Sequence, residues 1–244
     1  MISKQAICTL AVFCIFGNFA VAQEPDPREI LSRMSLEIAG LQQFTITGDA
    51  YSDARLDAGL IIEHAAQATM QVGKPDSVKI TNKTVEDYKE LYFTANQLTI
   101  YTQSKNFFGE VEFPEGTTDG LSYAVDELGI DAPMIDFVSG NVAEKMLATA
   151  TEVLYLDRSL IRDHEYEHIV IRTPEIDVQL WIAAEGPPLP GKMALSAKWD
   201  GGAPRTVVFM EWDTAPTFAD GPFDFEAPDG AVEIAIASQF DFEE

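Results

Sequence analysis

The stretch DVQLWIAAEGPPLPGK, Asp177–Lys192, decides the fold class of this sequence. Its first half alternates between two faces, with Val178, Leu180 and Ile182 on one of them. A period of two is typical of a half-buried β-strand. The Gly-Pro-Pro that begins at Gly186 must end this strand, because proline has no N–H for a ladder and glycine tolerates turn geometry.

A second alternating run, Met193–Trp199, follows this turn and predicts an antiparallel partner strand. Similar runs occur on both sides of a central helical stretch, with short turns and no helix between neighbours. The sequence therefore predicts a curved antiparallel sheet. The strand in the opening stretch is predicted over Ile176–Ala183. The other predicted strands are Phe44–Ala50, Leu60–Val72, Ser77–Val85, Leu91–Thr94, Gln97–Thr102, Phe107–Phe113, Val153–Asp157, Tyr166–Arg172, Arg205–Trp212, Phe223–Phe225 and Ala231–Ile236.

The first 22 residues have the pattern of a cleaved secretory signal. Lys4 supplies a positive start, Ala6–Phe19 is mostly apolar, and Ala20-Val21-Ala22 is a cleavage site before Gln23. The apolar run is shorter than the ~20 residues of a spanning helix. We expect residues 23–244 to form a single mature domain, since β-rich domains often reach this length undivided.

Charge and cysteine content limit the functions open to the chain. The sequence has 16 basic and 40 acidic residues, a net charge of −24, which becomes −25 without Lys4. A surface of that sign repels phosphate backbones, so nucleic acid is excluded as a partner. The only cysteines, Cys8 and Cys14, lie in the predicted signal. The mature chain must therefore fold without disulfides and has no thiol nucleophile.

Helices are predicted at the start of the mature chain and between the two strand blocks. Asp26 and Pro27 are a cap and a first residue typical of a helix start, followed by apolar residues at helical spacing. The central segments Leu121–Leu128, Pro133–Val138 and Val142–Ala150 are short and unusually apolar. Such helices are good candidates for a lid over a concave sheet.

Four segments of the chain resemble a bacterial family of predicted periplasmic proteins in the superfamily of the lipoprotein carriers LolA and LolB. They are KPDSVKI (Lys74–Ile80), LTIY (Leu98–Tyr101), EGTTDGLSYAVDELGIDAPMIDF (Glu115–Phe137) and QLWI with PPLPGK (Gln179–Lys192). The resemblance covers nearly all of residues 26–236. It implies an α+β fold: a strongly curved antiparallel β half-barrel with helices covering its concave face, an apolar cavity between them, and a periplasmic location. It transfers no catalytic residue.

One motif argues for an enzyme instead. His164-Glu165-Tyr166-Glu167-His168 matches the HExxH pattern of zinc hydrolases, in which a helix brings two histidines to one metal. The β-branched run that follows His168 favours a strand, where the two histidines would lie ~13 Å apart. We therefore prefer a hairpin strand with two exposed histidines and no metal site, and the zinc hydrolase stays the alternative.

The leading hypothesis is a non-catalytic periplasmic protein that binds or carries a lipid, a lipoprotein acyl chain or another apolar ligand. It needs no cofactor, inserts no segment stably into the membrane, and has envelope proteins as further partners. A ligand-free envelope adaptor or sensor is the second alternative. The candidate cavity-lining residues are large and apolar: Leu121, Val125, Leu128, Met134, Phe137, Trp181, Trp199 and Phe209.

Overall fold

The computed structural model describes residues 24–56, 59–74, 76–94, 96–113, 117–130, 134–198 and 204–236. Its helical segments are α1 (Pro27–Gly40), α2 (Thr117–Asp126), the 3-10 helix η2 (Ile135–Val138) and α3 (Val142–Ala148). Its strands are β1 (Gln43–Arg55), β2 (Ile61–Gly73), β3 (Ser77–Lys83), β4 (Tyr88–Thr94), β5 (Gln97–Thr102), β6 (Phe107–Glu112), β7 (Glu152–Ile161), β8 (His164–Arg172), β9 (Ile176–Ala183), β10 (Pro190–Ala197), β11 (Arg205–Asp213) and β12 (Val232–Glu233). The predicted signal, residues 1–22, and Trp199 lie outside the described residues.

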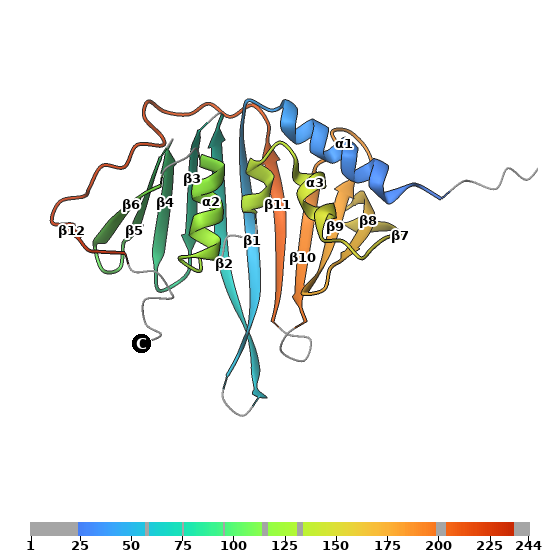
Figure 1. Cartoon of the computed structure of the whole chain (residues 1–244), viewed down its shortest axis with the longest axis horizontal. Helices are drawn as coiled ribbons and strands as arrows, with labels where there is room; N and C mark the ends of the chain where they lie inside the picture. Colours follow the sequence, from blue (N-terminus) through green and yellow to red (C-terminus); the bar gives the residue numbers. More distant parts are fainter. Residues whose placement is uncertain are drawn as a thin grey trace, which may run out of the picture.

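All the strands belong to one open sheet, in the order β12-β6-β5-β4-β3-β2-β1-β11-β10-β9-β8-β7. Neighbours are antiparallel, except that β12 runs parallel to β6. Two meanders, β1 to β6 and β7 to β11, meet where β1 pairs with β11. The sheet curves without closing, and every described helix lies on its concave face (Figure 1). This α+β half-barrel confirms the fold class predicted from the sequence.

Helix α1 starts where the capping residues predicted. The Asp26 carboxylate accepts a hydrogen bond of 2.9 Å from the Arg28 amide, and Pro27 occupies the first turn. The helix packs against α3 and β7. Its apolar stripe joins a core whose other members come from the inward faces of the strands. The buried apolar residues of α1 are Ile30, Leu31, Met34 and Ile38.

The lid segments attach to the two halves of the sheet in different ways. Helix α2 lies against β4 and β5. The short helix η2 is held by Phe137, which is fully buried and packs edge-on against Trp212 of β11, with ring centroids 5.7 Å apart. The Trp212 ring also packs against the Phe44 ring, with centroids 5.3 Å apart. Its indole N–H donates a hydrogen bond of 2.8 Å to the Pro190 carbonyl. These contacts fix the height of η2 above the sheet.

The chain after β11 is a strap that runs past the ends of the strands and then reaches the edge strand β6 (Figure 1). Phe225 rests on a patch of aromatic rings on the convex face, formed by Tyr92, Tyr101 and Phe108. The predicted strand Phe223–Phe225 is therefore wrong: these residues are held by side-chain packing and make no ladder. Within the described part of the strap, only β12 pairs with the sheet, and it covers the edge of β6.

The β7–β8 hairpin is longer than the sequence pattern predicted. Arg162 and Asp163 adopt left-handed φ angles of 49° and 65°, which make a tight two-residue turn. Both strands therefore continue to that turn, β7 to Ile161 and β8 from His164. Neither turn residue is glycine, so the local signal for this turn is limited to Asp163, because aspartate tolerates the left-handed region.

Candidate ligand-binding cavity

A cavity of about 230 Å³ lies between the concave face of the sheet and the segment that includes η2. Its floor comes from β1 to β4 and β11, and its roof from the residues around η2. Its surface is mainly apolar. The lining residues are Ala50, Ser52, His64, Ala65, Ala66, Ala68, Met70, Ile80, Asn82, Thr84, Leu91, Ile130, Met134, Ile135 and Val208.

Small side chains in the middle of β1 and β2 create the space. Ala50 lies opposite Ala66, and Gly48 lies opposite Ala68, on the face that points into the half-barrel. One step further along the same pair, Ile46 faces Met70, and both are fully buried in the core. The floor therefore changes from large to small side chains, and a void remains where the small ones lie.

Residues of the lid close the cavity from above. Met134 is 3% exposed and lies directly before η2, while Ile135 is its first residue. Because Phe137 anchors η2 to Trp212, the backbone of the lid cannot move down to fill the space above the alanines. The void is thus a consequence of a fixed roof over a floor of small residues.

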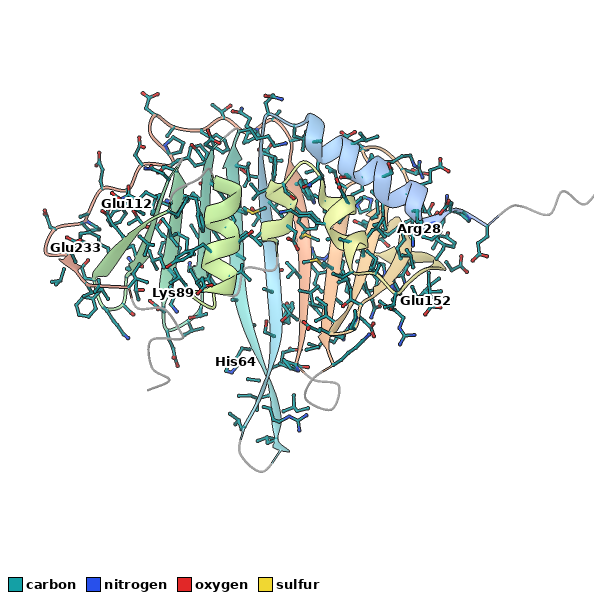
Figure 2. All side chains as sticks on the ribbon, in the orientation of Figure 1. Arg28, His64, Lys89, Glu112, Glu152 and Glu233 are labelled. Atoms are coloured by element: carbon teal, nitrogen blue, oxygen red, sulfur yellow. The ribbon has the colours of Figure 1, made fainter. Side chains whose placement is uncertain are left out.

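The polar lining residues lie at different levels along the cavity. Ser52 and His64 face each other across β1 and β2, and Asn82 lies opposite Ala68 near the end of β3. The Ser52 hydroxyl hydrogen-bonds the Thr206 hydroxyl at 3.1 Å. Figure 2 shows His64 where the β1–β2 hairpin leaves the body of the sheet. The pair Ser52 and His64 therefore forms a polar mouth at the hairpin end, while Asn82 lies deeper, beside Ala68.

Beyond this mouth, the β1–β2 hairpin continues as an arm without neighbouring strands among the described residues (Figure 1). The pairing of β1 with β11 ends at Ser52, and that of β2 with β3 begins only at Gln67. We call the described residues 53–56 and 59–64 the hairpin arm. Leu56 and Leu60, at its tip, are 47% and 58% exposed.

The two faces of the hairpin arm differ in character. Alternation places Asp53, Arg55 and Glu63 on one face, which is continuous with the convex side. The opposite face is apolar and continues from the tip to the alanines and Ser52 of the cavity. Its apolar residues are Ala54, Leu56, Leu60 and Ile62. An apolar track therefore leads from solvent to the cavity mouth.

The family model described as "Predicted periplasmic protein (DUF2092)" matches residues 28–237. The chain belongs to this family. No curated protein matches the sequence. Among the described residues of this DUF2092 chain, no helix is long and apolar enough to cross a membrane.

Three solved structures illustrate what the chain is similar to. An uncharacterized conserved protein from Thermus thermophilus is 10% identical, with 85% of this chain and 98% of that chain covered and a TM-score of 0.49. The lipoprotein LppX of Mycobacterium tuberculosis is 12% identical, with coverages of 80% and 100% and a TM-score of 0.47. A LolA superfamily protein from Nitrosomonas europaea is 12% identical, with coverages of 83% and 99% and a TM-score of 0.40.

Of the residues predicted from the sequence to line a cavity, Met134 does so. Leu121 and Phe137 are buried in the core, and Leu128 packs against that core. Val125 is 38% exposed on α2. These four residues support the lid without lining the cavity, because their side chains pack among core residues or face solvent.

Trp181 and Phe209 lie on the convex face, so they do not line this cavity either. Each alternates with a buried core residue of its own strand, Leu180 and Val208 respectively. The Lys192 ammonium lies over both rings, 4.2 Å from the centroid of Trp181 and 5.0 Å from that of Phe209. Successive side chains of a strand point to opposite faces of the sheet, so Trp181 and Phe209 point away from the core.

The floor residues were not predicted from the sequence, because large apolar side chains were expected to line the cavity. A void requires the opposite, since large side chains fill the space that they face. The signal in the sequence is the run Ala65-Ala66-Gln67-Ala68 in a strand, together with Gly48 and Ala50 in the strand before it. A strand pair with so little side-chain volume on one face leaves room for another molecule.

The HExxH match lies on β8, as a strand was predicted there. His164 is exposed, as predicted. The predicted exposure of His168 is wrong, because its ring is half-buried and stacks on Trp181, with ring centroids 4.2 Å apart. Glu167 points to the concave side, where it accepts hydrogen bonds from the Tyr155 hydroxyl (2.7 Å) and from Arg158 (3.1 Å). Burial and this carboxylate raise the pKa of Tyr155 to about 12. His168 and Glu167 thus point to opposite faces of β8, where Glu167 shares Arg158 with Glu165. Among the described residues, no group of three or more His, Cys, Asp or Glu could hold a metal.

Proposed function

We propose that this protein is a non-catalytic periplasmic binding or carrier protein whose cavity holds an apolar chain. The observation that carries the proposal is the void of about 230 Å³ between the alanines of β1 and β2 and the lid residues Met134 and Ile135. Apolar surface that packing leaves unfilled favours an apolar occupant, because each methylene buried there contributes ~0.8 kcal/mol. The ligand classes that fit are a lipid, an acyl chain of a lipoprotein or another greasy molecule.

The hairpin arm supplies the route to this cavity. Its apolar face carries Leu56 and Leu60 at the tip and ends at the polar pair Ser52 and His64, directly beyond which Ala50 and Ala66 form the floor. A ligand that moves along this face keeps part of its apolar surface away from water throughout. We propose that ligands enter and leave along the arm.

We further propose that the chain reaches the periplasm through a signal removed after Ala22, and that residues 23–244 act as one unit. This rests on Lys4, the apolar run and the Ala20-Val21-Ala22 site. N-terminal sequencing of the chain from a periplasmic fraction should begin at Gln23. Recovery of the intact chain in the membrane pellet would contradict this.

The binding proposal is tested by filling the cavity from its floor. The neutral apolar dye N-phenyl-1-naphthylamine should bind the wild-type chain saturably, near one per chain, with an increase in fluorescence. Ala66→Trp adds a large ring in the void and should abolish this binding. Gln67→Trp is the matched control, because the next residue of a strand points to the other face and Gln67 is exposed there.

Circular dichroism and thermal unfolding establish that both variants are folded. Equal dye binding by Ala66→Trp and wild type would show that the dye is held elsewhere. A folded wild-type chain that binds no dye would remove the carrier proposal, and the role of an adaptor for envelope proteins would take its place.

A further inference from the structure

The cavity adjoins a second hollow on the same face of the sheet. This hollow is a cleft of about 400 Å³ over β4, β5 and β6, and Ile234, which follows β12, forms part of its wall. Two pairs of directly opposed residues span the boundary. Asn82 of the cavity lies opposite Lys89 of the cleft, and Leu91 of the cavity lies opposite Ile100 of the cleft. The cavity and the cleft are therefore neighbours along β4.

A row of directly opposed residues crosses this boundary on the concave face. It runs from Ala68 of β2 through Asn82, Lys89 and Thr102 to Phe107 of β6. Opposed side chains of neighbouring strands have Cβ atoms ~5 Å apart, so one head group can contact both Asn82 and Lys89. The row is polar in its middle and apolar at both ends.

The Lys89 ammonium has no contact partner within the described part of the chain, and its side chain is exposed. The one acidic residue among the described lining residues of the cleft, Asp87, accepts hydrogen bonds from the amides of Tyr88 (2.9 Å) and Ser104 (3.3 Å). Burial raises the pKa of this carboxyl group, but hydrogen bonds from Ser104 and Tyr88 and the charge of Lys89 lower it below its ordinary value. Lys89 thus acts on Asp87 through space, and its N–H donors remain available.

The charge around this cleft differs in sign from that of the whole protein. Lys105, in the turn after β5, also lines the cleft, so the described lining has two lysines and one aspartate. The whole chain has a net charge of −24. Exposed charges more than ~10 Å away are largely screened by salt, so the local positive charge decides which head group the cleft attracts.

The cavity and the cleft are suited to different parts of one amphiphile. Among the described residues that line the cavity, none is Lys, Arg, Asp or Glu, and Ala68 forms its floor beside Asn82. The Asn82 amide has no hydrogen-bond partner among the described residues, and Lys89 lies directly beyond it. A chain that occupies the cavity would place its head where an amide and an ammonium group both offer N–H donors.

We propose that the ligand is an anionic amphiphile, with its apolar chain in the cavity and a carboxylate or phosphate head bound by Lys89 and Asn82. This rests on the proposed function, because the cavity must hold the chain. Lys89 donates a charge-assisted hydrogen bond to the head, and Lys105 adds attraction from the turn after β5. An alcohol of the same chain length keeps the contacts of the chain but gains nothing from these charges.

The test is displacement of bound N-phenyl-1-naphthylamine at pH 8, where lysine is protonated and decanoate is ionised. Decanoate and decyl phosphate carry an anionic head, whereas 1-decanol is neutral. With Lys89→Met, both anions should need at least tenfold higher concentrations than with wild type, while the concentration of 1-decanol should change less than twofold. Lys89→Gln, a second neutral replacement, should give the same loss. Anions that compete equally well with wild type and both variants would overturn the head-group proposal.

Lys83→Met is the matched control, because it removes the same charge from an exposed residue that follows Asn82 and points to the convex face. Its displacement by decanoate should match that of wild type. Equal losses in Lys83→Met and Lys89→Met would assign the effect to net charge and overturn the contact with Lys89.

Sodium acetate and sodium phosphate separate the head from the chain. At the concentrations at which decanoate acts, they should displace no dye, because they have no chain to occupy the cavity. Displacement by these salts would overturn the assignment of the chain to the cavity. A dye that fails to bind wild type at all would instead contradict the proposed function itself.

Discussion

The imidazole of His168 stacks on the indole of Trp181, with ring centroids 4.2 Å apart and planes inclined by 17°. The two residues are directly opposite each other on β8 and β9, and Lys192 and Phe209 continue the same row on β10 and β11. Trp181 thus has the imidazole on one side and the Lys192 ammonium 4.2 Å from its centroid. This row of side chains lies on the convex face of the sheet, opposite the face that carries the core.

The stacked histidine should make stability depend on pH. Burial lowers the pKa of His168 below its ordinary value of 6.5, while a hydrogen bond with Gln179 opposes the shift. The unfolded chain therefore binds this proton more readily, so stability is lost as the pH falls from about 6.5 through the lower folded pKa. The Tm of wild type should fall more between pH 7.5 and pH 5 than that of His168→Phe, which keeps a stacking ring but does not titrate.

His164→Phe is the control for this experiment, because His164 is exposed on the same face of the same strand. Its Tm should fall with pH as in wild type. A decrease in His168→Phe as steep as in wild type would show that the stacked imidazole does not couple folding to pH.

Substitutions at the tip of the hairpin arm should change ligand transfer more than affinity. Leu56→Ser with Leu60→Ser removes apolar surface from the proposed route but leaves the cavity intact. We expect transfer of N-phenyl-1-naphthylamine from phosphatidylcholine vesicles to slow several-fold in stopped-flow measurements, with little change in the equilibrium Kd. Leu160→Ser, which alters a leucine 71% exposed on the edge strand β7, should leave the rate unchanged. Equal rates in all three proteins would remove the arm from the route.

The C-terminal strap should depend on the absence of a side chain at Gly109. A Cβ there would lie 2.6 Å from Cγ1 of Ile236 and 2.8 Å from the carbonyl oxygen of Ile234, so the strap would have to shift. Gly109→Ala should reduce the free energy of unfolding by about 1–3 kcal/mol. Hydrogen exchange of residues 223–236 should accelerate. Gly40→Ala meets nothing within 4 Å and should stay within about 0.5 kcal/mol of wild type; a similar loss in both variants would argue against the strap contact.

The HExxH match should have no role in metal binding. On a strand, His164 and His168 are ~13 Å apart, beyond the reach of one zinc ion. His164→Ala should therefore leave the free energy of unfolding within about 0.5 kcal/mol of wild type, as expected for an exposed residue. Elemental analysis of purified wild type should find no stoichiometric zinc. Zinc at one per chain that disappears in His164→Ala would revive the hydrolase alternative.

The sequence by itself determined the period of each strand, and with it the curved antiparallel sheet. Alternation from Val178 to Ile182 and the Gly-Pro-Pro turn were sufficient, because burial of one face imposes a period of two. The start of α1 at Asp26 and Pro27 was equally determined, since capping acts within one helical turn. The family resemblance predicted the helices on the concave face.

Only the tertiary structure decided where the molecule is hollow. Alternation showed that Trp181 and Leu180 point to opposite faces of the sheet. Which face the helices cover, and whether side chains fill the space beneath them, depends on which strands are neighbours. Ala50 and Ala66 belong to a cavity only because β1 pairs with β2 and because the contact of Phe137 with Trp212 fixes the lid above them. A void is the absence of a long-range contact, and no local pattern of residues specifies it.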